Sequence, residues 1–185
     1  MNQIEDERIK FYLKHEARIR EWAGLEPEVR EFVNRFYRSI ESDLNEAVRG
    51  GKIADDGVEL FFVEEYKGWP GLGLRRRDWP KGDEAPDVRL EWNRRSARFS
   101  RDEKLICGVR TTEKRYKQHF TRELCPDYPH RGDYWAAYTH VEPPGGEFWE
   151  GENLKEYRGY LVGTILKAWK DLAPLVDKAV DYPRS

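Results

Sequence analysis

Cysteine and methionine are scarce in this chain, which has two cysteines and one methionine in 185 residues. Two cysteines cannot build the framework of several disulfides that holds small secreted domains together. The N-terminal residues are polar and lack the apolar core of a secretory signal peptide. No apolar run approaches the roughly 20 residues that cross a bilayer. These absences predict a cytoplasmic protein that does not contact a membrane.

An excess of charge of one sign is also absent. Lysine and arginine number 33 against 35 aspartates and glutamates, so the net charge is -2. Such a chain has no overall field that would attract DNA or an anionic membrane, although local patches can still form. Aromatic residues make up 14% of the chain and include seven tryptophans. These large rings bury enough surface to argue against disorder, and the length suits one domain.

The sequence motifs of the common cofactor and nucleophile sites are missing. No glycine-rich phosphate loop follows a predicted strand and opens a helix, and no G-x-S-x-G stretch occurs. Cys125, Asp127, His130 and Asp133 share one loop, but no second pair of ligands completes the spacing of a structural zinc site. We therefore predict no cofactor and no metal.

Two helices are predicted at the start of the chain. Residues 4–23 place their apolar side chains on one broad face. The stretch "GLEP" follows, and Pro27 suits the first turn of a second helix. Gly50 and Gly51 end this second helix, whose stripe is regular: Val29, Phe32, Val33, Phe36, Tyr37, Ile40, Leu44 and Val48. Two helices with so short a link predict a helical hairpin over residues 1–51.

The apolar pattern changes to that of strands after the second helix. Segments separated by Gly, Pro, Asp or Ser predict strands at residues 58–66, 72–79, 88–95, 104–111 and 134–141. The short connections favour an antiparallel meander. A short helix is predicted at about 112–124 and a long closing helix at about 153–182. The expected fold class is α+β, with the hairpin, a four- to five-stranded antiparallel sheet over 57–142, and the C-terminal helix packed on one face of one domain, 1–185.

The stretch "GWPGLGLRRRDWP" (68–80) places three arginines between two tryptophans. Strand alternation splits the arginines: Leu72, Leu74 and Arg76 point one way, and Gly73, Arg75, Arg77 and Trp79 the other. The next strand adds Arg89 and Glu91 to the second side if the two strands pair. The candidate binding residues are therefore Trp69, Arg75, Arg77, Trp79, Arg89 and Glu91.

Three interpretations of this arginine-bearing face remain open. Arginines beside tryptophans can bind single-stranded nucleic acid through phosphate contacts and stacking. They can equally anchor an acidic protein surface. The third interpretation is a solvated sheet face whose arginines pair with Glu59, Asp78 and Glu91. We favour a protein partner over nucleic acid, because the splitting of the three arginines leaves only a small notch.

An enzymatic alternative lies in "ADDGVELFFVEEYK", where Asp56 is followed by Glu65 and Lys67. Nucleases of the PD-(D/E)XK type use such a grouping, in which two acidic groups hold a divalent cation and a lysine assists the attacking water. Glu65 and Lys67 share a strand face, as that chemistry requires. The gap from Asp56 is short and no proline precedes it, so a surface ion pair is the alternative interpretation.

The order of the elements resembles the C-terminal, non-catalytic part of uncharacterised bacterial proteins of the PD-(D/E)XK superfamily. The residues that carry the resemblance are "IKFYLKHEARIREWAGL", "GWPGLGLRRRDWP", "VRLEWNRR" and "EFWEG". The nuclease core that those proteins carry upstream is absent here, so the resemblance implies a stand-alone accessory or recognition domain and transfers no catalytic residue. Many of those proteins are associated with restriction or defence.

The expected function is thus a non-catalytic binding or accessory module that recognises another macromolecule, a protein above all, in bacterial defence or phage conflict. A metal-dependent nuclease and a single-strand nucleic-acid binder are the alternatives. The sequence specifies neither the partner nor the oligomeric state.

Overall fold

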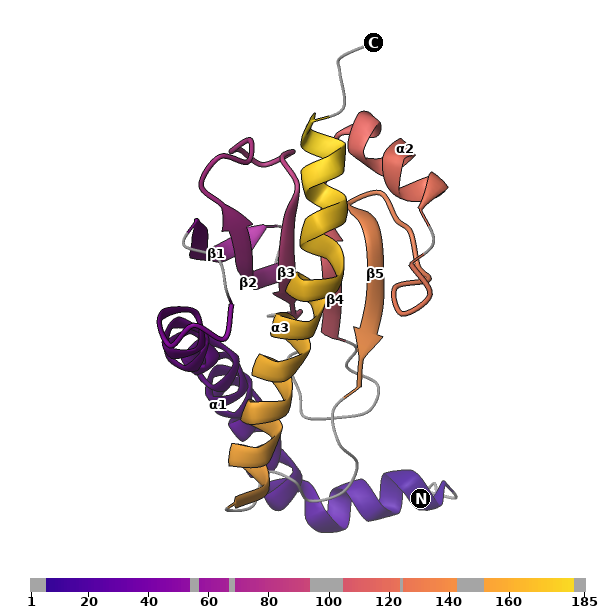
Figure 1. Cartoon of the computed structure of the whole chain (residues 1–185). Helices are drawn as coiled ribbons and strands as arrows, with labels where there is room; N and C mark the ends of the chain where they lie inside the picture. Colours follow the sequence, from indigo (N-terminus) through magenta and orange to yellow (C-terminus); the bar gives the residue numbers. More distant parts are fainter. Residues whose placement is uncertain are drawn as a thin grey trace.

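The computed structural model describes residues 6–53, 57–66, 69–93, 105–123, 125–142 and 152–181. Three helices and five strands follow one another along these residues (Figure 1): α1 (Glu7–Arg49), β1 (Val58–Tyr66), β2 (Trp69–Arg76), β3 (Asp87–Glu91), β4 (Leu105–Arg110), α2 (Lys114–Arg122), β5 (Trp135–Val141) and α3 (Glu152–Asp181). The predicted α+β class is confirmed. Three of the strands lie within one residue of their predicted bounds, whereas β2 begins and ends three residues early and β3 ends four residues early.

The strands form one antiparallel sheet in the order β1-β2-β3-β4-β5, which is the meander that the short connections predict. Leu72 of β2 stands opposite Leu90 of β3, and Leu90 stands opposite Cys107 of β4. Since neighbours in register share a face, these three side chains form an apolar row across the sheet. All three are fully buried.

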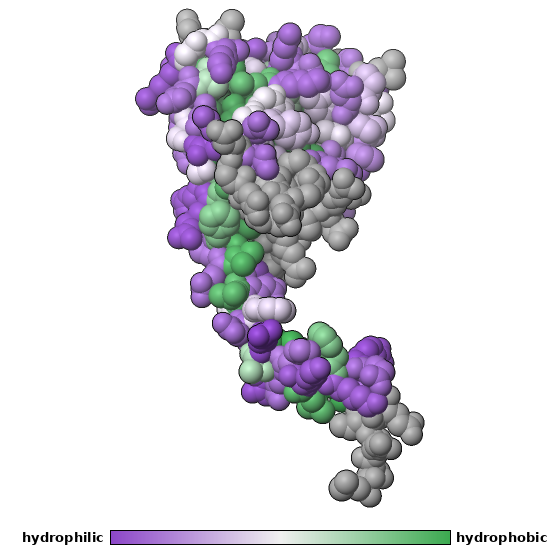
Figure 2. Space-filling model, turned by 90° about the horizontal axis from the view of Figure 1, so that it is seen from below, coloured by the Kyte–Doolittle hydropathy of each residue, from purple (hydrophilic) through white to green (hydrophobic). Residues whose placement is uncertain are grey.

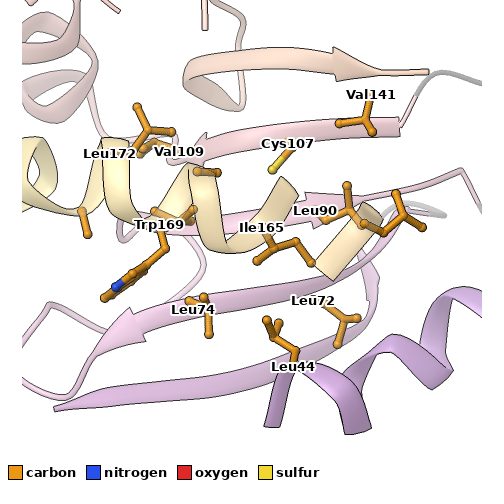
Figure 3. Close-up of a cluster of buried hydrophobic side chains, with 14 of the residues drawn as sticks. Leu44, Leu72, Leu74, Leu90, Cys107, Val109, Val141, Ile165, Trp169 and Leu172 are labelled. Atoms are coloured by element: carbon orange, nitrogen blue, oxygen red, sulfur yellow. The ribbon is translucent and has the colours of Figure 1, made fainter. Parts of the chain in front are cut away.

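Helix α3 covers this apolar face, as predicted, and lies over β3 and β4 roughly along their direction (Figure 1). Figure 3 shows Ile165 and Trp169 of the helix above Leu74 and Leu90 of the sheet, in one cluster of buried side chains. Burial of each such side chain contributes about 1.5–3 kcal/mol. Helix α2 packs beside β5 and α3. Helix α3 thus covers one face of the sheet, and the opposite face carries Arg75, Arg89 and Glu91 of the predicted binding residues.

The predicted helical hairpin is wrong, because α1 is one helix of 43 residues that continues through Pro27. A proline inside a helix removes one backbone hydrogen bond, a loss that a bend can accommodate without reversing the chain. Gly24 does not adopt the positive φ that a turn would use, since the glycines with positive φ in the described residues are Gly51 and Gly82. Asp6 caps the helix start by accepting a hydrogen bond from the backbone N–H of Arg8.

Among the described residues, the second part of α1 is the part that packs against the sheet and α3. Phe36 stacks on Tyr157 of α3 with ring centroids 5.7 Å apart, and Arg158 of α3 donates to Asp43 over 2.7 Å. Val33, Phe36, Tyr37, Ile40, Leu44 and Ala47 are buried. Residues 7–32, here called the arm, extend away from the sheet (Figures 1 and 2).

Across the described residues, no helix combines the length and the apolar character needed to cross a membrane.

Candidate functional site

The structure separates the three arginines of "GWPGLGLRRRDWP" as strand alternation predicts. Arg75 pairs with Glu59 of β1, with 3.3 Å between Nε and Oε2, and its guanidinium lies 4.7 Å from the centre of the Phe61 ring. Arg76 points to the other side, where its Nε donates to Asp177 of α3 over 2.8 Å. Arg77 is exposed, with its Nε 3.9 Å from Glu59. The splitting of the arginines between two faces is therefore confirmed.

Trp79 does not lie with Arg75 and Arg77, so that part of the prediction is wrong. Its ring packs against Trp169 of α3 with centroids 5.3 Å apart, and its Nε1 donates to Asp177 over 2.8 Å. Strand β2 ends at Arg76 and a turn follows, so strand alternation no longer applies at residue 79. Only 3% of Trp79 is exposed, and it belongs to the core. Trp69 begins β2 and is half-buried.

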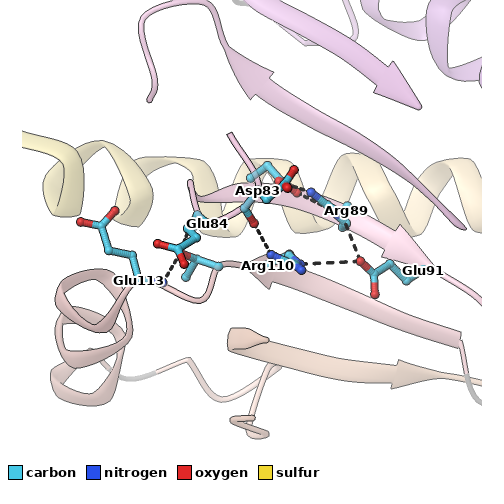
Figure 4. A network of polar contacts seen from close by, with 8 residues as sticks. Asp83, Glu84, Arg89, Glu91, Arg110 and Glu113 are labelled. Carbon is cyan, nitrogen blue, oxygen red and sulfur yellow. Dashed lines mark hydrogen bonds and ion pairs between the residues drawn. The ribbon is translucent and has the colours of Figure 1, made fainter. Parts of the chain in front are cut away.

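The two remaining candidates, Arg89 and Glu91, are members of a buried network of charges on the sheet face opposite α3. The Arg89 guanidinium donates to both carboxylate oxygens of Asp87, by a bond of 2.6 Å from Nε and by a second bond from Nη2. Its Nη1 donates to Glu91 over 3.2 Å. Arg110 of β4 lies 4.0 Å from the same Glu91 oxygen. Figure 4 shows Arg89, Glu91 and Arg110 pointing toward one another across the two strands.

Hydrogen bonds from Arg110 and from its neighbour Thr111 also hold the loop before β3 in place. Arg110 donates to the carbonyl of Asp83, and the Thr111 hydroxyl donates to the carbonyl of Glu84. The backbone N–H of Glu113, the residue that precedes α2, donates to the Thr111 hydroxyl over 3.2 Å. The buried charges are thus part of the frame that joins β3, β4 and the start of α2.

Glycines flank Arg89 on both neighbouring strands, Gly73 on β2 and Gly108 on β4. A Cβ added at Gly108 would lie 2.1 Å from the carbonyl oxygen of Ala137 on β5, a distance that no real pair of atoms can adopt. A Cβ at Gly73 would lie 2.4 Å from the Phe61 ring. The absence of a side chain at Gly73 therefore allows the Phe61 ring to pack closely over β2.

The two carboxylates of the network differ in how well they are paired. Burial raises the pKa of Glu91 to about 7, against the opposing influence of Arg89 and Arg110. Burial by itself would lower the pKa of Arg89, but Asp87 and Glu91 outweigh it and the pKa is raised. Asp87 accepts two bonds from Arg89, whereas Glu91 accepts one longer bond.

Glu91 should make the stability of the protein depend on pH. Its pKa is higher in the folded state than the ordinary value of 4.5, so folding favours the protonated form. This contribution is fully present below about pH 4.5 and is lost as the pH rises through about 7. We expect the free energy of unfolding to fall by on the order of 2–3 kcal/mol over that interval.

Urea denaturation at several pH values from 4.5 to 8 measures this dependence on Glu91. The Glu91→Gln variant should show a flatter pH dependence than the wild-type protein. All other groups are the same in the two proteins, so the difference between the two curves isolates Glu91. Two parallel curves would contradict the assignment.

The nuclease candidates cannot be compared in space. Asp56 and Lys67 lie outside the described residues, and for Glu65 the structure describes the backbone in β1 but not the side chain. Among the described residues, no three His, Cys, Asp or Glu side chains form a group that could hold a metal ion. In the loop considered for zinc, Cys125 is buried and Asp127 pairs with Lys167 over 2.6 Å.

The arm is a feature whose exposure the sequence patterns did not reveal. Trp22 is 65% exposed and Phe11 is 60% exposed, although both belong to the apolar stripe of a long helix. The other large apolar residues exposed on the arm are Ile9, Tyr12, Leu13, Leu25, Val29 and Phe32. Figure 2 shows apolar side chains along the projecting helix. The apolar stripe itself was visible in the sequence, but in the predicted hairpin the second helix would have buried it.

Comparisons of the chain with protein-family models, with curated proteins and with solved structures find no match. No activity or partner can therefore be transferred from a relative, and the function has to be argued from the geometry.

Proposed function

We propose that the protein is a non-catalytic binding module that recognises another protein, and that the arm of α1 is its binding surface. The observation that supports this is the exposure of Phe11, Trp22 and Val29 on one helix, at 60%, 65% and 52%. Single exposed apolar side chains are ordinary, whereas a contiguous set marks a surface that is covered in use. Tryptophan and tyrosine are the residue types that most often anchor protein interfaces.

The sheet face supports binding less well than the arm does. Arg89 and Glu91 are 6% and 5% exposed and satisfy each other together with Asp87. A ligand that took Arg89 would leave buried carboxylates without their partner, which costs several kcal/mol. Arg75 is held by Glu59, and Arg77 alone of the predicted cations is largely exposed. The same pairing weakens the case for a single-strand nucleic-acid site on this face.

A cytoplasmic location belongs to this proposal, as does the accessory role in bacterial defence or phage conflict that the resemblance implies. The two cysteines, Cys107 and Cys125, are free and buried. Burial raises the pKa of the Cys107 thiol to about 12, so this thiol stays unreactive. Free thiols of this kind suit a reducing compartment.

Affinity capture of the full chain from a lysate of the native host tests the proposal. A variant with Phe11, Trp22 and Val29 replaced by serine should lose its partner, because these side chains supply the apolar contact. A control variant with Arg75 and Arg77 replaced by serine should keep it. Because the arm side chains are exposed, the purified triple variant should unfold at the same temperature as the wild type when both are too dilute to associate. Capture that depends on Arg75 and Arg77 but not on the arm would refute the proposal.

A further inference from the structure

The arm also indicates what kind of protein it binds. Building on the proposed function, we infer that the partner is a second copy of this chain, and that the two arms lie side by side in antiparallel orientation. The inference rests on the apolar stripe of the arm and on the order of the charges beside it.

The apolar stripe of the arm continues the stripe that forms the core. Val33, Phe36 and Ile40 are spaced three and four residues apart and are buried against the body of the protein. At the same spacing toward the N-terminus lie Val29, Trp22, Ile19, His15 and Phe11. Residues at this spacing share one helix face. The face that packs in the second part of α1 therefore continues along the arm, where Phe11, Trp22 and Val29 are exposed and His15 and Ile19 are half-buried.

The net charge of the arm reverses along its length. Residues 7–20 carry five basic and two acidic side chains, so this half has a net charge of +3. Residues 21–32 carry four acidic and one basic side chain, a net charge of -3. A second arm laid antiparallel places each half against a half of opposite sign, whereas a parallel arm places like against like.

The charges that border the stripe show the same reversal residue by residue. The side chains that immediately precede Phe11, His15 and Ile19 are basic: Lys10, Lys14 and Arg18. The side chains that immediately precede Trp22 and Val29 are acidic: Glu21 and Glu28. In an antiparallel pair of helices this border of one helix meets the same border of the other. Three cations at one end therefore face acidic side chains at the other end.

One register satisfies both the apolar and the charged positions. With the two-fold axis near residues 20 and 21, Phe11 lies beside the partner's Val29, and Ile19 lies beside the partner's Trp22. Lys14 then reaches the partner's Glu28. The arm is about 39 Å long at 1.5 Å per residue, and two such arms can bury on the order of 1,000 Å². An interface of that size is sufficient for a specific dimer.

Charge reversal at Lys14 and Glu28 tests both the partner and the orientation. Within one chain these residues are about 21 Å apart along the helix, so they cannot pair with each other. Sedimentation equilibrium of the purified full chain, from about 1 µM to about 100 µM, should show a dimer for the wild type. Lys14→Glu and Glu28→Lys should each raise the dissociation constant about tenfold, since each reverses two symmetric contacts.

Combining the two charge reversals, in one chain or in a mixture of the two single variants, then tests whether Lys14 contacts the partner's Glu28. The double variant with both reversals in one chain should dimerise like the wild type, because each glutamate again meets a lysine. An equimolar mixture of the two single variants should form heterodimers more tightly than either variant pairs with itself. Both side chains are exposed, so all four proteins should have the same thermal unfolding midpoint when it is measured at a concentration low enough for each of them to be monomeric.

A monomer at every concentration would overturn the inference, as would a dimer that neither combination restores. The two experiments distinguish a failure of the self-association inference from a failure of the proposed function. If the chain is monomeric and the lysate capture still depends on Phe11, Trp22 and Val29, the binding module stands and its partner is a different protein. If the capture is also insensitive to the arm, both are wrong.

Discussion

Replacing Arg89 by methionine is expected to lower the free energy of unfolding by about 3–5 kcal/mol. Arg89 is 6% exposed and holds the two buried carboxylates of Asp87 and Glu91. Methionine fills much the same volume but donates no hydrogen bond, so both carboxylates would remain buried without their main partner. Urea denaturation measures the loss as a lower midpoint at an unchanged slope.

The matched control for Arg89→Met is Arg75→Met, one strand away on the same face of the sheet. Arg75 pairs with Glu59 at a site where both side chains are over a quarter exposed. Loss of that pair should cost less than about 1 kcal/mol. Adding Asp87→Asn and Glu91→Gln to Arg89→Met should restore part of the stability, because no unpaired charge is then left. If Arg89→Met were as mild as Arg75→Met, Arg89 would be free to bind a ligand and the structural role would be wrong.

Replacing Gly108 by alanine is the second change with a large expected effect. The added Cβ would lie 2.1 Å from the Ala137 carbonyl oxygen and 2.6 Å from the Tyr138 Cα, both on the backbone of β5. A backbone contact cannot be relieved by rotating a side chain, so β4 and β5 would have to separate. We expect a loss of about 3 kcal/mol or more in the free energy of unfolding.

The same substitution to alanine at Gly163 of α3 should have the opposite effect on stability. No atom lies within 4 Å of a Cβ added there, and the residue is an exposed part of the helix. Alanine at this position should stabilise the protein by about 0.5–1 kcal/mol. Thermal unfolding of the two variants tests both predictions: the midpoint should fall for Gly108→Ala and rise for Gly163→Ala. A Gly108→Ala protein as stable as the wild type would show that β4 and β5 are not in such close contact.

The sheet was predictable because alternation and turn residues are local signals. The separation of Arg75 from Arg76 follows from period two alone, as does the common face of Leu72 and Leu74, whereas the row of Leu72, Leu90 and Cys107 also needs the strand register. Trp79 was misplaced because the strand ends at Arg76, and alternation has no meaning in the turn that follows. The position of a strand end depends on pairing with its neighbour, which one segment of sequence does not contain.

The candidate site was predictable only in part. Arg89 and Glu91 were recognised as the polar side of a strand, but their burial depends on what covers that side. Asp87 alternates with them at the same spacing and was missed, although this signal was available. Arg110 joins the network from β4: the strand register places it opposite Asp87, and its side chain extends to within 4.0 Å of Glu91.

The arm shows what an apolar stripe in the sequence does not predict. A stripe such as Phe11, Ile19 and Trp22 predicts a helix and the face it will bury, but not what will cover that face. The hairpin was one way to cover the stripe within the chain. The continuous helix through Pro27 leaves Phe11 and Trp22 exposed, and what covers them is the question that the proposed second copy answers.

Site-specific photocrosslinking in the native host tests most directly whether the arm is the binding surface. A benzophenone amino acid is placed at Trp22 in one protein and at Arg77, the exposed cation of the sheet, in another. The account predicts a specific protein adduct from position 22 and none from position 77, and mass spectrometry of the adduct shows whether the partner is a second copy. An adduct from position 77 with none from position 22 would contradict it.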